Sequence, residues 1–310
     1  MITTVTFNPA IDKTITVDHF TLGLVNRVEQ VQENIGGKGI NVAKVLHLLG
    51  APTTAIGFIG EKNYSFVQQF IKAENLVTDF ILVDALTRTN TKIIDPSIQT
   101  TTDINEQGFT VNDTQVDQMT LLINRYSKIS DMMVFSGSAC KGLSADDVKT
   151  LLQMVQSKTK VVLDADGDIL KEGIKASPFL IKPNIYELEN LLGKTLNGTQ
   201  EILSAVRDLI NTYHITYVLV SMGEQGSMLI SKDEAYLSDI LKVNVVSTVG
   251  AGDSMLAGFL YHLSLHGSPS EALQFGACTG SLAVSSISTE TLKSSDIHSI
   301  AKTISVIKLD

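Results

Sequence analysis

The hydrophobic positions of this chain follow two periods in alternation. Short apolar runs, typical of buried strands, are followed by segments in which apolar residues recur every three or four positions, as on one face of a helix. Strands are predicted at 2–7, 53–59, 132–136, 161–164, 179–182, 217–221, 228–230 and 235–237. Helices are predicted from about 38 to 49, through 116–123, and at 64–73, 145–155, 187–192, 202–213, 251–266, 271–284 and 297–304. The alternation predicts an α/β protein with a mostly parallel sheet covered on both faces.

Two segments break this alternation. Residues 14–32 and 87–102 have no helical period and read as polar-faced strands. We expect them to pair into a small separate sheet over the carboxyl edge of the main sheet, where open α/β sheets bind ligands. Such a sheet would be a lid that excludes water, and its exposed face would suit a dimer contact. The alternative is a pair of long surface loops, which are uncommon in compact domains.

Composition excludes several classes of protein. The chain has 310 residues, is 44% hydrophobic and carries a net charge of −9. A core of useful size is therefore expected, and an acidic chain without a basic face does not suit nucleic acid. No apolar run approaches the ~18 residues of a membrane span, and residues 1–7 read as a strand rather than a signal peptide. Two cysteines are too few for a disulfide framework, so we expect a cytoplasmic protein.

The segment 248–254, Thr-Val-Gly-Ala-Gly-Asp-Ser, joins a valine-rich strand to a long apolar helix. Its glycines, Gly250 and Gly252, free backbone N–H groups at a helix N-terminus, which is a ready anion site. Asp253 would repel a static phosphate, but it is well placed to accept a proton from a hydroxyl that attacks phosphorus. The alternative is that Asp253 only caps the helix.

The segment 36–41, Gly-Gly-Lys-Gly-Ile-Asn, opens the first predicted helix. A lysine at a helix N-terminus is unfavourable unless an anion is present, so Lys38 suggests an anionic ligand. Asn41 could hold a hydroxyl, and Asp12, just after the first strand, could grip another. The alternatives are a flexible glycine turn and an ordinary turn aspartate. Arg27 and Arg88 lie in the two lid segments and could clamp a phosphate.

Two further strand ends carry polar residues. Lys182 follows one buried strand and could neutralise a nucleotide phosphate, while Glu187 could organise Mg²⁺ through water. Asn184 and Glu187 also have the spacing of a capping box, which is compatible with that role. Residues 221–226, which include Ser221, Gly223 and Gly226, could line a nucleotide or form only a hairpin turn.

Asp164, Asp166 and Asp168 resemble a calcium loop at first sight. Ile169 and Lys175 stand where that loop needs glycine and glutamate, so we reject a calcium site.

Four motifs, 8–12, 36–41, 182–187 and 249–254, occur in an order and spacing that resemble those of the ribokinase-type sugar kinases, the phosphofructokinase B family. The resemblance spans almost the whole chain. It implies a ribokinase-like, Rossmann-type three-layer sandwich as one kinase domain, residues 1–310, with lid strands inserted at about 13–34 and 87–107. It also implies ATP and Mg²⁺. From the exposed face of the lid sheet we expect a homodimer formed through the lid.

The resemblance assigns roles to residues. It implies Asp253 as general base with Gly250, Ala251 and Gly252 as anion hole. It implies Asp12, Gly37, Lys38 and Asn41 in the sugar site, and we expect Arg27, Arg88 and Ser138 to hold the phosphate already on the sugar. Lys182, Asn184, Ser221, Gly223, Gly226 and Thr248 would bind the nucleotide, with Glu187 reaching Mg²⁺ through water.

Within this family the motifs most resemble bacterial 1-phosphofructokinases, which implies transfer from ATP to the C6 hydroxyl of fructose 1-phosphate. Tagatose-6-phosphate kinases are similar, and Ala139 and Cys140 replace the usual Leu-Pro beside Ser138, so the sugar stays open. A kinase for an unphosphorylated sugar would have no need of the cationic residues. A non-catalytic sensor would have no need of a base at Asp253.

Overall fold

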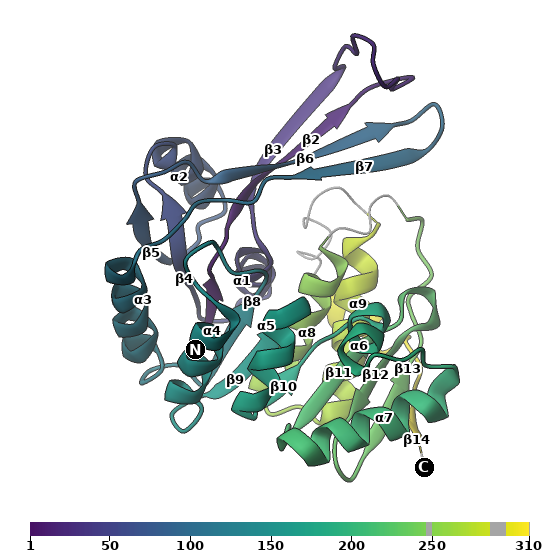
Figure 1. Cartoon of the computed structure of the whole chain (residues 1–310). Coiled ribbons are helices and arrows are strands. Elements are labelled where there is room, and N and C mark those ends of the chain that lie inside the picture. Colours follow the sequence, from purple (N-terminus) through teal and green to yellow (C-terminus); the bar gives the residue numbers. More distant parts are fainter. Residues whose placement is uncertain (246–249, 286–295, 310) are drawn as a thin grey trace.

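The main sheet has ten strands in the order β14-β13-β12-β11-β10-β9-β8-β1-β4-β5 (Figure 1). The computed structural model describes residues 1–245, 250–285 and 296–309. The strands are β1 (Ile2–Thr6), β4 (Thr53–Gly60), β5 (Thr78–Val83), β8 (Met132–Ser136), β9 (Lys160–Asp164), β10 (Leu180–Ile181), β11 (Tyr217–Ser221), β12 (Ser227–Ile230), β13 (Ala235–Ser238) and β14 (Val306–Leu309). In this spatial order, the strands from β11 across to β5 pair parallel with their neighbours. Strands β12, β13 and β14 pair antiparallel, β12 with β11 and then each with the next.

Helices cover both faces of this sheet because its strands are apolar on both sides. One face packs against α3 (Asp113–Tyr126), α4 (Ala145–Val155), α5 (Gly167–Gly173), α6 (Ile185–Leu192) and α7 (Gly198–Tyr213). The other packs against α1 (Lys38–Leu48), α8 (Ala251–Ser264), α9 (Pro269–Ala283) and α10 (Ile297–Ala301). Alternate residues of one strand enter the two cores: Met133 and Phe135 face the first, Met132 and Val134 the second. The prediction of a three-layer α/β sandwich is therefore confirmed.

A second sheet of four strands has the order β3-β2-β6-β7 and projects beyond the main sheet (Figure 1). Its strands are β2 (Ala10–Thr16), β3 (Gln30–Gly36), β6 (Arg88–Asp95) and β7 (Thr100–Asn105). Strand β2 leaves the carboxyl end of β1 after three residues, and β3 runs directly into α1. We call this sheet the lid. Its separate pairing confirms the predicted small sheet, although residues 14–32 form two strand segments with a loop at 17–29 between them.

A smaller apolar cluster joins the lid to the body. Helix α2 (Tyr64–Ala73) packs Val67 and Ile71 against Ile11 and Ile35 of the lid hairpin. The base of the lid is therefore part of a packed core, whereas β7 is exposed along its whole length.

The structure corrects the predicted elements in four places. Strand β5, helix α5 and strand β14 were not predicted, and the predicted helix 297–304 ends at Ala301. Strand β5 has a mixed exposure along an outer edge of the sheet, and α5 is only seven residues long. The apolar run at 80–83 in β5 is a strand signal that sequence reasoning missed, whereas α5 is too short to show a helical period. None of the helices in the described residues is long and apolar enough to cross a membrane.

Candidate active site

The N-terminus of α8 presents backbone donors. Gly250 precedes the helix with φ of 77°, in the left-handed region that glycine adopts without strain. The first bond within the helix runs from the N–H of Ser254 to the carbonyl of Gly250, at 2.8 Å. The N–H groups of residues 251–253 therefore have no acceptor within the helix. Together with the positive end of the helix dipole, they are arranged to bind an anion.

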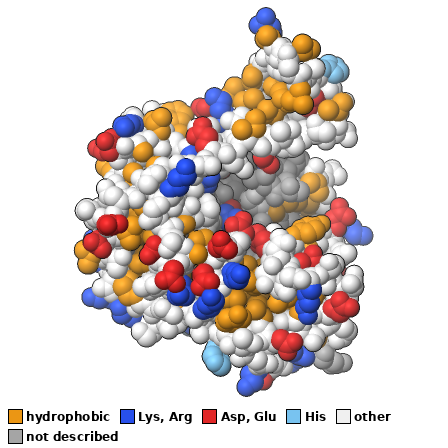
Figure 2. Space-filling view, in the orientation of Figure 1, with side chains coloured by type: hydrophobic (Ala, Val, Ile, Leu, Met, Phe, Trp, Pro, Cys, Tyr) orange, Lys and Arg blue, Asp and Glu red, His pale blue; other side chains and the backbone are white. Residues whose placement is uncertain are grey.

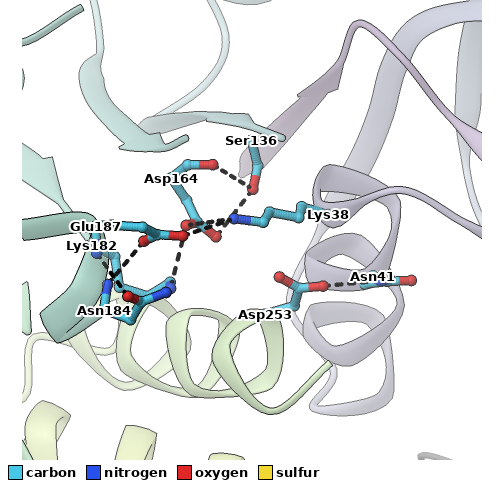
Figure 3. A network of polar contacts seen from close by, with 8 residues as sticks. All are labelled: Lys38, Asn41, Ser136, Asp164, Lys182, Asn184, Glu187 and Asp253. Atoms are coloured by element: carbon cyan, nitrogen blue, oxygen red, sulfur yellow. Dashed lines mark hydrogen bonds and ion pairs between the residues drawn. The ribbon is translucent and has the colours of Figure 1, made fainter. Parts of the chain in front are cut away.

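Asp253 lies among these donors and is 7% exposed. Its Oδ2 accepts a hydrogen bond of 2.9 Å from Asn41 Nδ2 on the facing helix α1 (Figure 3). Burial, followed by repulsion from Asp164, raises the pKa of Asp253 from its ordinary 3.8 to about 6. Asn41 and the ammonium groups of Lys182 and Lys38 oppose that rise. The carboxylate is thus a stronger base than a free aspartate and stays mainly ionised at neutral pH.

Asp164, at the end of β9, forms ion pairs with Lys182 and Lys38. It is fully buried, and its Oδ1 lies 3.2 Å from Lys182 Nζ and 3.7 Å from Lys38 Nζ (Figure 3). Ser136, at the end of the neighbouring strand β8, donates a hydrogen bond of 3.2 Å to Asp164 Oδ2. Asp164 is the main cause of a raised pKa at Lys38, against the effect of burial. A buried charge needs such partners, so the carboxylate fixes both ammonium groups beside the α8 donors.

The two carboxylate oxygens of Glu187 have different contacts. Its Oε2 accepts from the N–H of Asn184, while Asn184 Oδ1 accepts from the N–H of Glu187, at 2.8 and 2.9 Å. This is a capping box at the start of α6. The other oxygen, Oε1, lies 3.8 Å from Lys38 Nζ. The capping box is therefore real, and it leaves one carboxylate oxygen directed at the lysine cluster.

The acidic residues fit a metal ion that arrives with phosphate ligands. No group of three or more His, Cys, Asp or Glu within the described residues is arranged to hold a metal ion. The buried Asp164 Oδ1 has ion pairs but no hydrogen bond, and Glu187 Oε1 faces the same space. Mg²⁺ is usually bound by one or two carboxylates together with substrate phosphates and water. This pair suits such an ion better than it suits a protein-only metal cage.

A second polar cluster lies at the base of the lid. Asn90 Nδ2 of β6 donates to Asp12 Oδ1 of β2 at 3.2 Å, since the two residues are register neighbours. Arg88 donates to the carbonyl of Asn8 at 3.1 Å, and Asn8 Nδ2 reaches Ser138 Oγ at 3.4 Å. Arg88 Nε, Asn8 Oδ1 and Asn90 Oδ1 are buried without a hydrogen-bond partner. Buried polar atoms of this kind are normally satisfied, so they suit a polar ligand.

Gly36 and Gly37 allow the backbone to pass close to this cluster. A Cβ at Gly36 would stand 1.8 Å from Asp12 Oδ2. Gly37 has φ of 108°, and a Cβ there would lie 3.1 Å from Pro9 Cα. Both positions therefore require glycine, and the close approach places α1, with Lys38 and Asn41, beside Asp12.

The structure places some predicted residues differently from what we expected. Lys38 is directed toward Asp164 and Glu187 rather than toward Arg88. Arg27 is exposed in the loop beyond the far end of the β2–β3 hairpin, well away from Asp12. Thr248 lies outside the described residues.

The proposed nucleotide-lining turn follows β11. Ser221 ends that strand and forms an isolated bridge with Asn184, which sets the turn beside the α6 cap. Gly223 has φ of 59°, and a Cβ at Gly226 would lie 2.0 Å from the carbonyl oxygen of Ser238. The turn therefore also has a structural reason for its glycines.

Sequence reasoning missed Asp164, Ser136, Asn90 and the side-chain role of Asn8. Asp164 was considered only as part of a calcium loop, although its place at the end of a buried strand was a signal. Asn90 could have been found from the register that sets it beside Asp12, but that register is set by tertiary pairing.

We predict that Asp164→Asn lowers the pKa of Asp253 from about 6, because a like charge that raises it is removed. A ¹³C-NMR titration of the side-chain carboxyl carbons measures this pKa directly. Asp117→Asn, an exposed change on α3, is the matched control and leaves the titration unchanged. An unchanged or higher pKa in Asp164→Asn contradicts the electrostatic account of the site.

The chain is similar to known proteins of one family. The model of the pfkB family carbohydrate kinases matches residues 5–296. The chain is 37% identical to a 1-phosphofructokinase of Haemophilus influenzae and 32% identical to one of Borreliella burgdorferi, covering 92% and 90% of this chain and 91% and 90% of those proteins. A crystal structure of a putative phosphofructokinase from Staphylococcus aureus has a TM-score of 0.85 at 30% identity, covering 100% of this chain and 99% of that one. The chain therefore belongs to the pfkB family of carbohydrate kinases.

Proposed function

We propose that this protein transfers the γ-phosphoryl group of ATP to the C6 hydroxyl of fructose 1-phosphate, giving fructose 1,6-bisphosphate and ADP. The observation that carries the proposal is the buried carboxylate of Asp253, whose pKa is raised to about 6. This carboxylate lies among backbone N–H groups that have no acceptor within α8. A base beside an anion site is the pairing that phosphoryl transfer to a hydroxyl needs. The sugar is taken from the relatives, which are named 1-phosphofructokinase.

The reaction transfers a phosphoryl group to the sugar and a proton to Asp253. The C6 oxygen attacks the γ-phosphorus, the bond from that phosphorus to the β–γ bridging oxygen breaks, and ADP leaves. Asp253 accepts the hydroxyl proton, and Asn41 holds the carboxylate in place for it. The N–H groups of residues 251–253 stabilise negative charge on the transferring group. Lys182 and Lys38, both beside Asp164, offset the same charge.

The lid-base cluster is our proposed sugar-phosphate site. Asp12 accepts hydrogen bonds from sugar hydroxyls, with the backbone of Gly37 beside it. Arg88 and Ser138, which meet at Asn8, hold the phosphate already on the sugar. Arg27 reaches that phosphate only when its loop bends over the body, and Lys38 stands between the sugar and nucleotide sides.

The nucleotide is proposed to lie along the carboxyl ends of β10 and β11. Lys182, Asn184, Ser221, Gly223, Gly226 and Thr248 are its proposed ligands. Glu187, through water, and Asp164 would hold the Mg²⁺ ion that ATP carries. When bound, the ion withdraws charge from the β and γ phosphates.

We also propose that residues 1–310 form a single kinase domain and that the enzyme works in the cytoplasm, where ATP is supplied. We further propose that two chains associate through the lid. Hydrophobic side chains gather on the lid, above a hollow in the face that it overhangs (Figure 2). The large exposed ones are Leu22, Leu24, Val25, Val28, Val31, Ile98 and Ile104, between 48% and 88% exposed. A patch of this kind marks an interaction site.

The substrate assignment is tested by ADP release with Mg-ATP and, separately, fructose 1-phosphate, tagatose 6-phosphate, fructose 6-phosphate and free fructose. We expect a strong preference for fructose 1-phosphate, because the anchored phosphate fixes C6 at the base. A preference for tagatose 6-phosphate would keep the catalytic roles and move the attacking hydroxyl to C1. No turnover with any of them would overturn the proposal and favour a sensor or an unphosphorylated substrate.

Asp253→Asn is expected to lower kcat about 100-fold or more, because an amide cannot accept the hydroxyl proton. ATP binding, measured by calorimetry, stays within about threefold, since the backbone donors remain. Asp117→Asn is the matched control. Near-normal turnover in Asp253→Asn would return that residue to a capping role.

The lid contact is tested by sedimentation. The wild-type chain is expected at twice the 33.5 kDa of one copy, and Val25→Asp/Val31→Asp is expected to shift it toward one copy, because charge in an apolar contact is costly. Leu121→Asp, at a position 69% exposed on α3, is the control. A monomeric wild type would refute the dimer.

A further inference from the structure

Lys44 is a buried charge that the proposed reaction does not use. It lies on the inner side of α1 and is 8% exposed. Its Nζ donates a hydrogen bond of 2.6 Å to the carbonyl of Ile35 and lies 3.9 Å from Glu74 Oε1. Burial lowers the pKa of Lys44, against the charges of Glu74 and Asp12. An apolar side chain of this volume would avoid the desolvation cost, so stability alone does not explain the lysine.

The carbonyl that Lys44 holds is at the junction between lid and body. Ile35 pairs with Ile11, the residue before Asp12, and is followed by Gly36, Gly37 and then α1. Glu74 directly follows α2. One ammonium group therefore ties together the base of the lid hairpin, α1 and α2, at the point where Asp12 enters the site.

Asp12 depends on its surroundings for its position. Its carboxylate rests on the bare backbone of Gly36, the residue that follows Ile35. Burial raises the pKa of Asp12, whereas the hydrogen bond from Asn90 lowers it, followed by the charges of Lys44 on α1 and of Arg88 and Lys92 on β6. Of these three cations, Lys44 has the largest effect, and it comes from the body rather than the lid.

We propose that Lys44 is a positioning residue for sugar binding, which fixes the Ile35–Gly36 backbone and so presents the Asp12 carboxylate to the sugar hydroxyls. The inference rests on the proposed function, because it takes Asp12 as a sugar ligand. Lys44 does not touch the substrate. It acts through the carbonyl of Ile35 and through its charge.

The test is Lys44→Met, which keeps the length of the side chain and removes its charge. We expect the KM for fructose 1-phosphate to rise about tenfold, with kcat and the KM for ATP within about twofold, because the defect is confined to sugar binding. The acidic limb of kcat/KM for the sugar is expected to move to higher pH, since loss of a cation raises the pKa of Asp12. Lys44→Arg, which keeps the charge, is expected to recover part of both effects.

Two controls separate this role from a merely structural one. Lys72→Met removes a charge from an exposed position of α2 and should leave both KM values unchanged. When Lys44→Met is added to Asp12→Asn, the pH profile of kcat/KM for the sugar should not shift further, because the carboxylate that titrates is gone.

An unchanged sugar KM in a folded Lys44→Met, or an equal rise in both KM values, overturns the proposal. Should Lys44→Met fail to fold, Lys44→Gln carries the same test. A wild-type enzyme inactive on every sugar phosphate would instead refute the proposed function, so the two failures are distinguishable.

Discussion

The candidate site depends on the burial of one carboxylate, that of Asp164, at the end of a central strand. A fully buried anion must be compensated, and here the compensation is drawn from two other elements, by Lys182 after β10 and Lys38 at the start of α1. The N-terminus of α1 and the ends of β9 and β10 are thereby held at one point. Asp253 joins them from α8, and the repulsion between the two carboxylates contributes to its raised pKa. Buried ion pairs seldom improve stability over apolar packing, so this arrangement is better explained by function.

The lid adds a second constraint, because its base must be fixed while its outer part projects from the body. Apolar contacts of Ile11 and Ile35 with α2 fix the base, and the glycines at 36 and 37 let it pass close to Asp12. Farther out, β7 and the loop at 17–29 have few packed side chains. Asp12 and Arg88, which we propose as ligands of the sugar phosphate, belong to the fixed part. Arg27 belongs to the outer part, which explains why it is distant from them.

The sequence predicted those parts of the fold whose side chains repeat with a clear period. Helices α2 and α4 and strands β8 and β11 have the predicted ends, because an apolar stripe or run stops there with capping or turn residues. Helix α5 is too short for such a pattern, and the apolar run at 80–83 in the edge strand β5 was missed. In the site, Asp253 and Asn41 could be placed by motif. The direction of Lys38 could not, since it is set by Asp164, whose burial follows from sheet order rather than from any local spacing.

The charged groups of the proposed nucleotide side bear on whether the nucleotide binds with a divalent cation. Three carboxylates, those of Asp164, Glu187 and Asp253, face two ammonium groups, those of Lys38 and Lys182. A site of this balance has no excess positive charge with which to receive a polyphosphate, and the α8 donors supply only partial charges. In the proposed reaction, a divalent cation carried by the nucleotide would remove this deficit and give the carboxylates a partner. The acids that would repel bare ATP would therefore favour the proposed magnesium complex, while Lys38 and Lys182, held by Asp164, offset the charge of the transferring group.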